Sequence, residues 1–125
     1  MKYISTRGGG TPQSFEQVLL TGLAPDGGLY VPVELPAFSS EQIASWRDLS
    51  YVDLALEVIS PFIGDALSPE ELKRIITESY TDFGHPDVAP LITLRENEYL
   101  LELYHGPTLA FKDFALQVLG RLLDH

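Results

Sequence analysis

The chain has 125 residues, which suits a single domain, and 45% of them are hydrophobic, enough to form a packed core. Its formal net charge of −10, from 18 acidic and 8 basic residues, argues against binding to nucleic acid or to an anionic membrane surface, because both select clustered lysine and arginine. The absence of cysteine excludes disulfides and thiolate zinc sites, and the first ten residues contain no apolar run, so we expect neither a signal peptide nor a membrane span and take a cytoplasmic location as the default.

The first elements in chain order are a short helix and a short strand. Ser14 and Gln17 are spaced as a capping box, and Gly22 is a typical helix stop. The Asp-Gly-Gly sequence at 26–28 predicts a turn, and the apolar residues 29–31 predict a brief strand directly after it.

Two further helices are predicted before residue 62. Ser39 and Gln42 indicate a small one, and Ser50 precedes a longer one, in which the apolar residues between 51 and 59 recur at helical spacing. Pro61 lacks the amide hydrogen that a helix interior requires, so we expect it to bend or end this helix.

The clearest helix start lies at residues 68–71. Ser68 can cap the helix, Pro69 suits its first turn, and Glu71 occupies the third position of a capping box. The apolar residues that follow, up to Phe83, share one face, and Gly84 is the expected stop.

The pattern then changes to that of a β-hairpin. The runs at 91–94 and 99–104 are strand-like and flank a polar turn. His105, Gly106 and Pro107 form a second turn, after which Thr108 is placed to cap a final helix from about Leu109.

This final helix is amphipathic, and Lys112 falls on its apolar side. In the first turn the helix dipole disfavours a cation by about 0.3–1 kcal/mol. Apolar surroundings disfavour the ammonium form of a lysine, which makes the neutral amine available to attack an aldehyde. The alternative is a solvated lysine whose stem lies along apolar neighbours while its head reaches water. The apolar stripe comprises Ala115, Leu116, Leu119 and Leu123, and the polar stripe comprises Asp113, Gln117, Gly120, Arg121 and Asp124.

Two separated segments resemble one enzyme family in the same order and at the same spacing. LYHGPTLAFKDFALQ, residues 103–117, closely resembles the cofactor-lysine signature of threonine synthases. The segments KYISTRG (2–8) and SFEQVLLTGLAPDGGLYVP (14–32) resemble the N-terminal domain of the same family, as do DLALEVISPFIGD and SPEELKRII between them. The resemblance therefore covers essentially the whole chain.

The resemblance implies a fold, a cofactor and a reaction. Lys112 would form the Schiff base with pyridoxal 5'-phosphate (PLP), and O-phospho-L-homoserine and water would become L-threonine and phosphate. The fold would be α/β: a mostly helical N-terminal fragment with short strands and one small β-hairpin, part of a larger tryptophan-synthase-β-like fold. We expect residues 1–90 to form the N-terminal domain and residues 91–125 to begin the PLP-binding domain.

Such a site binds two phosphates, so it needs cations and backbone amides at short range. Arg7, which follows Ser5 and Thr6 and precedes three glycines, could bind a phosphate, although a flexible turn fits the same sequence. His105 could contact substrate or move a proton, and the alternative is a turn histidine with a satisfied hydrogen bond. Thr108 has the sequence position of a helix cap, and the alternative is a contact to substrate.

Several expectations concern the chain as a whole. His85 and His125 have no ligand-spaced partners, so no metal site is expected. The last helix has no glycine stop, which suggests that the chain is truncated and that its partner is the remainder of its own chain. We expect these residues alone to be inactive, and either to self-associate or to order the last helix poorly. Two other functions stay open: a related PLP phospho-lyase acting on a similar substrate, and a non-catalytic docking module.

Overall fold

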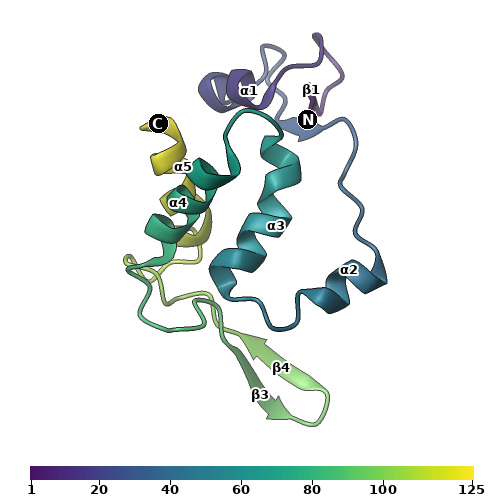
Figure 1. The fold of residues 1–125 in the computed structure, drawn as a ribbon. Coiled ribbons are helices and arrows are strands. Elements are labelled where there is room, and N and C mark those ends of the chain that lie inside the picture. Colours follow the sequence, from purple (N-terminus) through teal and green to yellow (C-terminus); the bar gives the residue numbers. More distant parts are fainter. The chain divides into compact units, whose positions relative to one another are not determined.

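The computed structural model describes all 125 residues, which divide into two compact units. Unit 1 comprises residues 1–48 and 56–72, and unit 2 comprises residues 49–55 and 73–125. The fold is mixed α/β, as the sequence predicted, with five helices and two small two-stranded antiparallel sheets, of which the sequence predicted only the hairpin (Figure 1). None of the five helices has the length and apolar character that crossing a lipid bilayer requires.

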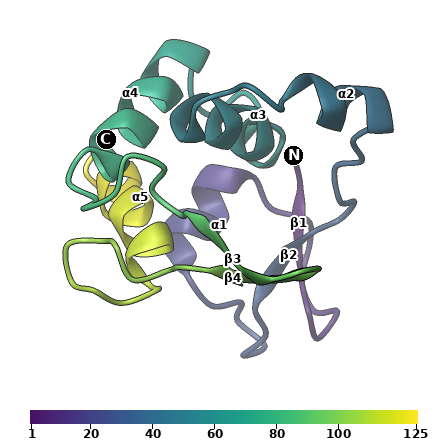
Figure 2. The same cartoon turned by 90° about the horizontal axis from the view of Figure 1, so that it is seen from below.

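Unit 1 is built on a short antiparallel ribbon. β1 (Tyr3–Ser5) pairs with β2 (Tyr30–Pro32), and α1 (Phe15–Thr21) lies beside the two strands (Figure 2). The predicted capping box of α1 is confirmed: the Gln17 amide donates to the Ser14 hydroxyl, and the Ser14 amide donates to the Gln17 side chain. These bonds satisfy amides at the helix start without any tertiary contact, which is why the sequence pattern located the helix.

The next two helices begin where the sequence predicted. α2 (Ser40–Ser45) and α3 (Tyr51–Ile63) follow their serines directly. Pro61 lies inside α3, so of the two effects expected of it, a bend or an end of the helix, the end is excluded. The last turn is held by tertiary contacts, because Ile63 is 2% exposed and the Tyr3 hydroxyl donates to the Phe62 carbonyl at 2.6 Å. Contacts of this kind offset the backbone hydrogen bond that the helix loses at proline, which has no amide hydrogen.

The start of α4 (Pro69–Tyr80) is confirmed in detail, and its end differs from the prediction. The Ser68 amide and hydroxyl donate to the Glu71 carboxylate, at 3.0 and 2.7 Å, and the Glu71 amide donates back to the Ser68 hydroxyl at 3.2 Å. The helix ends at Tyr80, before the predicted stop at Gly84, and a turn follows in which the Phe83 amide donates to the Tyr80 carbonyl.

In unit 2, α5 (Asp113–Leu123) lies alongside α4 (Figures 1 and 2). Two hydrogen bonds join the helices: the Tyr80 hydroxyl donates to the Phe114 carbonyl at 3.0 Å, and the Ser79 hydroxyl donates to the Gln117 carbonyl at 3.2 Å. The buried apolar side chains of this unit are Ile75, Ile76, Tyr80, Phe83, Val88 and Val118. These contacts make α4 the framework on which α5 is positioned.

The β-hairpin is confirmed and belongs to unit 2. β3 (Leu91–Arg95) pairs with β4 (Glu98–Leu101), and Leu91 lies opposite Leu101. The turn uses Asn97 at a φ of 60°, a left-handed conformation that asparagine tolerates better than most residues. The hairpin extends away from α4 and α5 (Figure 1), and its apolar side chains are largely exposed.

Candidate functional site

The candidate residues are divided between the two units, and each group has its own hydrogen-bond network. Whether any of them contacts a cofactor or substrate stays a prediction. Unit 1 contains Ser5, Thr6 and Arg7, and unit 2 contains His105, Thr108 and Lys112.

Lys112 lies immediately before α5, at its N-cap position. Its carbonyl accepts the amides of Ala115 and Leu116, so the backbone of Lys112 is fixed by the first turn of the helix. Its side chain is exposed and borders a hollow of about 530 Å³. Every other residue around the hollow is apolar: Leu103, Phe111, Phe114, Ala115 and Leu116. The Lys112 amine is therefore the only ionisable group at the edge of an apolar surface.

The apolar stripe of α5 faces outward in this chain. Leu116, Leu119 and Leu123 are 53%, 38% and 51% exposed, whereas Asp113, from the polar stripe, is 2% exposed. The covered side of α5 is partly apolar as well, because Val118 is 8% exposed and the Phe114 ring lies 5.0 Å from the Phe83 ring between centroids, so α5 has apolar side chains on both sides. Lys112 precedes α5, whereas the sequence predicted it in the first turn of the helix, but it borders the apolar side beside Ala115 and Leu116.

The prediction that the last helix begins near Leu109 with Thr108 as its cap is wrong. Residues 106–112 form turns instead: the Leu109 amide donates to the Gly106 carbonyl at 3.0 Å, and the Asp113 amide donates to the Ala110 carbonyl at 3.0 Å. Leu109 has a φ of 60°, a left-handed conformation that costs a residue with a Cβ roughly 1–2 kcal/mol. The helix starts at Asp113.

Thr108 binds Asp113 rather than the backbone of a helix first turn. The Thr108 amide donates to Asp113 Oδ2 at 2.8 Å, and the Thr108 hydroxyl lies 2.9 Å from both carboxylate oxygens. Burial raises the pKa of Asp113, but the hydrogen bonds from Thr108, Gln117 and Ala110 outweigh it, so the net effect lowers that pKa. Asp113 is thus a buried carboxylate held in its charged form.

His105 lies in a cluster with an acid and two further rings. Its Nε2 is 2.6 Å from Glu102 Oε2, and both side chains are largely covered. The His105 ring is 5.1 Å from the His85 ring and 4.6 Å from the Tyr104 ring, measured between centroids. A hydrogen bond from Tyr104, followed by that from His105, lowers the pKa of Glu102. This pairing orients the imidazole and provides the satisfied hydrogen bond that the sequence left as an alternative.

In unit 1, Asp26 organises the predicted phosphate-binding segment. Its carboxylate accepts the Ser5 hydroxyl at 2.7 Å and the amides of Gly9 and Gly28, each at 2.9 Å. The pKa of Asp26 is lowered by these bonds, that from Ser5 being the largest cause. The Arg7 guanidinium donates through Nη1 to the Asp26 carbonyl at 3.0 Å. Ser5 is buried and bound internally, whereas Arg7 is exposed and keeps further N–H donors.

Thr6 extends the pairing of the two strands of unit 1. Its amide donates to the Leu29 carbonyl at 2.8 Å, and its hydroxyl accepts the Leu29 amide at 3.0 Å. The amide and the hydroxyl of Thr6 therefore both bind the neighbouring strand of the ribbon from which Arg7 extends.

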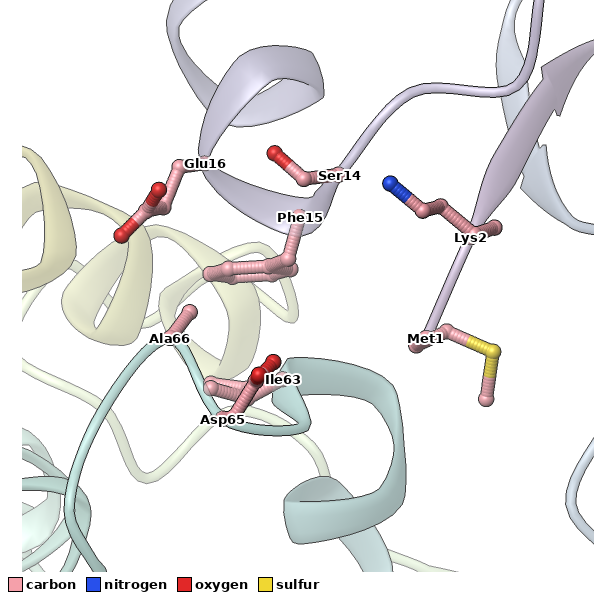
Figure 3. Close-up of a pocket in the computed structure, with 8 residues that line it drawn as sticks. All are labelled: Met1, Lys2, Ser14, Phe15, Glu16, Ile63, Asp65 and Ala66. Carbon is pink, nitrogen blue, oxygen red and sulfur yellow. The ribbon is translucent and has the colours of Figure 1, made fainter.

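A second cavity, of about 490 Å³, lies in unit 1 and carries mixed charge (Figure 3). The Phe15 ring lies in its middle, with Glu16 and Asp65 on two sides, and the Lys2 side chain points toward Ser14 (Figure 3). None of these residues was a sequence candidate, and the cavity has no group of metal-ligating side chains.

Sequence reasoning missed the two acids that organise the candidate residues. Asp26 lies in a recognised turn, and nothing in the turn pattern indicates a bond to Ser5 across the strand pair. Glu102 precedes His105 by three residues in a segment that is neither helix nor strand, so no periodicity indicated that the acid and the imidazole pair.

Solved structures define the class of fold. The structure of PLP-bound threonine synthase from Brucella melitensis matches 99% of this chain with a TM-score of 0.96 and 50% sequence identity, over 27% of its own length. The mixed α/β arrangement is therefore that of the N-terminal part of threonine synthase structures.

Sequence comparisons give the family. The family model described as threonine synthase N terminus matches residues 2–80. Threonine synthase from Pseudomonas aeruginosa is 58% identical over all of this chain, and threonine synthase-like 2 from Xenopus laevis is 40% identical over all of it. The chain belongs to the threonine synthase family, in its N-terminal region. It spans 27% of the length of each of these two relatives.

Proposed function

We propose that this chain is the N-terminal part of a threonine synthase that converts O-phospho-L-homoserine and water to L-threonine and phosphate with PLP as cofactor. The observation that carries the proposal is the placement of Lys112 beside the apolar hollow, within the segment that resembles the family's cofactor-lysine signature. A relative with 50% identity is described as PLP-bound, which supports the same cofactor for this chain.

The residues around Lys112 fit PLP. A primary amine is the group that condenses with an aldehyde, and the apolar side chains beside it suit an aromatic ring. The bound cofactor would supply an electron sink for carbanions on the substrate. Lys112 Nζ would hold the cofactor covalently and later carry protons between the carbon atoms of the substrate.

The other candidates would serve the substrate. We propose Arg7 for a phosphate group, because its guanidinium is exposed and uses Nη1 on the Asp26 carbonyl, which leaves other donors. His105, oriented by Glu102, would donate or accept a proton at Nε2 or bind a substrate oxygen. Ser5, Thr6 and Thr108 also remain candidate substrate contacts, although each hydroxyl already has an internal partner.

The test of this function is product analysis of the full-length protein. We expect O-phosphohomoserine to yield threonine and inorganic phosphate in equal amounts, and the Lys112→Ala variant to lose both the activity and the cofactor absorbance near the visible edge. The 125 residues alone should form no threonine, since they contribute one cofactor residue and part of the substrate site. Persistence of the absorbance in Lys112→Ala would instead favour a docking role for this region.

A related PLP phospho-lyase is the second candidate. Lys112 would serve either reaction, because both begin with the same cofactor and a similar substrate. Release of phosphate from the same substrate without threonine would identify this activity.

The exposed apolar face of α5 supports a further expectation about partners. We propose that the remainder of the full-length protein covers Leu116, Leu119 and Leu123, and that the excised chain self-associates through them. A strictly monomeric 125-residue chain in sedimentation experiments would contradict this.

A further inference from the structure

Asp113 is the only charged side chain that is buried, and the proposed chemistry gives it no role. We propose that Asp113 is a positioning residue for Lys112: its carboxylate, bonded to Thr108, closes residues 108–113 into a ring that fixes the backbone from which the Lys112 amine extends. This inference rests on the proposed function, because it concerns how Lys112 is presented to an aldehyde.

Hydrogen bonds between Thr108 and Asp113 form the ring. The Asp113 carboxylate accepts the Thr108 amide at 2.8 Å and the Thr108 hydroxyl at 2.9 Å. The Asp113 amide closes a second, smaller loop by donating to the Ala110 carbonyl at 3.0 Å. Lys112 lies inside both loops, and its own carbonyl is bound by the helix. The backbone of Lys112 is thus fixed from both directions along the chain.

The ring is also closely packed on the side of Gly106. A Cβ at Gly106 would lie 2.4 Å from Asp113 Cβ and 2.5 Å from its Oδ2, so the loop encloses the carboxylate without room for a side chain. Leu109, between Thr108 and Asp113, is in a left-handed conformation. A strained residue of this kind persists where the surrounding bonds determine the backbone.

The Lys112 side chain itself has no polar partner that would fix its direction. Lys112 takes part in no ion pair and donates no hydrogen bond, and its side chain is exposed. Only its backbone position and its apolar neighbours limit where the amine points. Because misplacing a reacting group by about 1 Å can slow a reaction by about a hundredfold, a fixed backbone at this residue bears directly on capture of an aldehyde.

The experiment uses the full-length protein freed of cofactor and compares Asp113→Asn, Thr108→Val and a control, Asp124→Asn. The control removes the same charge from an exposed position of the same helix region. Two quantities are measured: amide hydrogen exchange over residues 106–113, and the rate at which Lys112 captures added PLP, read by absorbance, borohydride trapping and peptide mapping.

In Asp113→Asn we expect the amides of the loop to exchange hydrogen about tenfold faster and Lys112 to capture PLP about tenfold more slowly than in the unsubstituted protein. Asp124→Asn should match the unsubstituted protein in both rates. Thr108→Val should act in the same direction, and the double variant should be no slower than Asp113→Asn, because both changes break the same ring. Capture that is equally fast in the unsubstituted protein and in Asp113→Asn, even with a lowered melting temperature, overturns the positioning role. A lack of labelling at Lys112 in the unsubstituted protein refutes the proposed function instead.

Discussion

Replacing Gly106 with alanine tests how tightly the loop before α5 encloses Asp113. The added Cβ would lie 2.4 Å from Asp113 Cβ and 2.8 Å from its Cγ, whereas carbon atoms in contact are about 3.5–4.0 Å apart. The loop and the helix start must therefore separate by about 1 Å. Overpacking of this kind typically costs about 1–3 kcal/mol, and we expect a destabilisation in that range.

The matched control is Gly120→Ala in the same helix. No heavy atom lies within 4 Å of a Cβ at Gly120, and alanine in a helix interior is more favourable than glycine by about 0.5–1 kcal/mol, so this change should stabilise α5. Hydrogen exchange of the α5 amides gives the free energy of opening directly, which is preferable because the two units need not unfold together. A neutral or stabilising Gly106→Ala would refute the enclosed loop.

Two further predictions concern stability. Tyr80→Phe removes the hydroxyl that binds the Phe114 carbonyl and should lower the stability of α5 by about 1 kcal/mol. The control Tyr99→Phe, on the exposed hairpin, should change that stability by less than about 0.5 kcal/mol, and equal effects of the two changes in hydrogen exchange would contradict this. The pKa values of Asp113 and Asp26 are lowered in the folded chain, so their stabilising effect is complete above the ordinary value of 3.8 and is lost as the pH falls through the lower folded values. Urea unfolding at a series of acidic pH values should therefore show stability falling as the pH drops below about 3.8, and stability that stays constant at lower pH would contradict it.

The parts of the fold that the sequence predicted well are those governed by bonds between near neighbours. Ser14 with Gln17, and Ser68 with Glu71, cap their helices through bonds across three residues, so the pattern contains all the participants. The sequence predicted that Pro61 bends or ends α3, and it could not show that the helix continues past Pro61, because the contacts that hold its last turn involve Tyr3, which is distant in sequence.

The candidate site shows the same limit. Thr108 has the sequence of a helix cap, but the Asp113 carboxylate competes for its amide and hydroxyl, and periodicity gives no indication of which partner prevails. The apolar side of α5 and the place of Lys112 on it were predictable, because they depend on spacing alone. The exposure of this apolar side depends on how α5 packs against α4, and the burial of Asp113 depends on the loop at Gly106 and Thr108.

The central claim is that Lys112 is the residue that binds PLP. The chain contains three lysines, Lys2, Lys73 and Lys112, so the claim has a definite readout. Borohydride reduction of the PLP-loaded full-length protein, followed by peptide mapping, should place the reduced pyridoxyl group on Lys112. Label on another lysine, or none on the peptide that contains Lys112, would contradict the account.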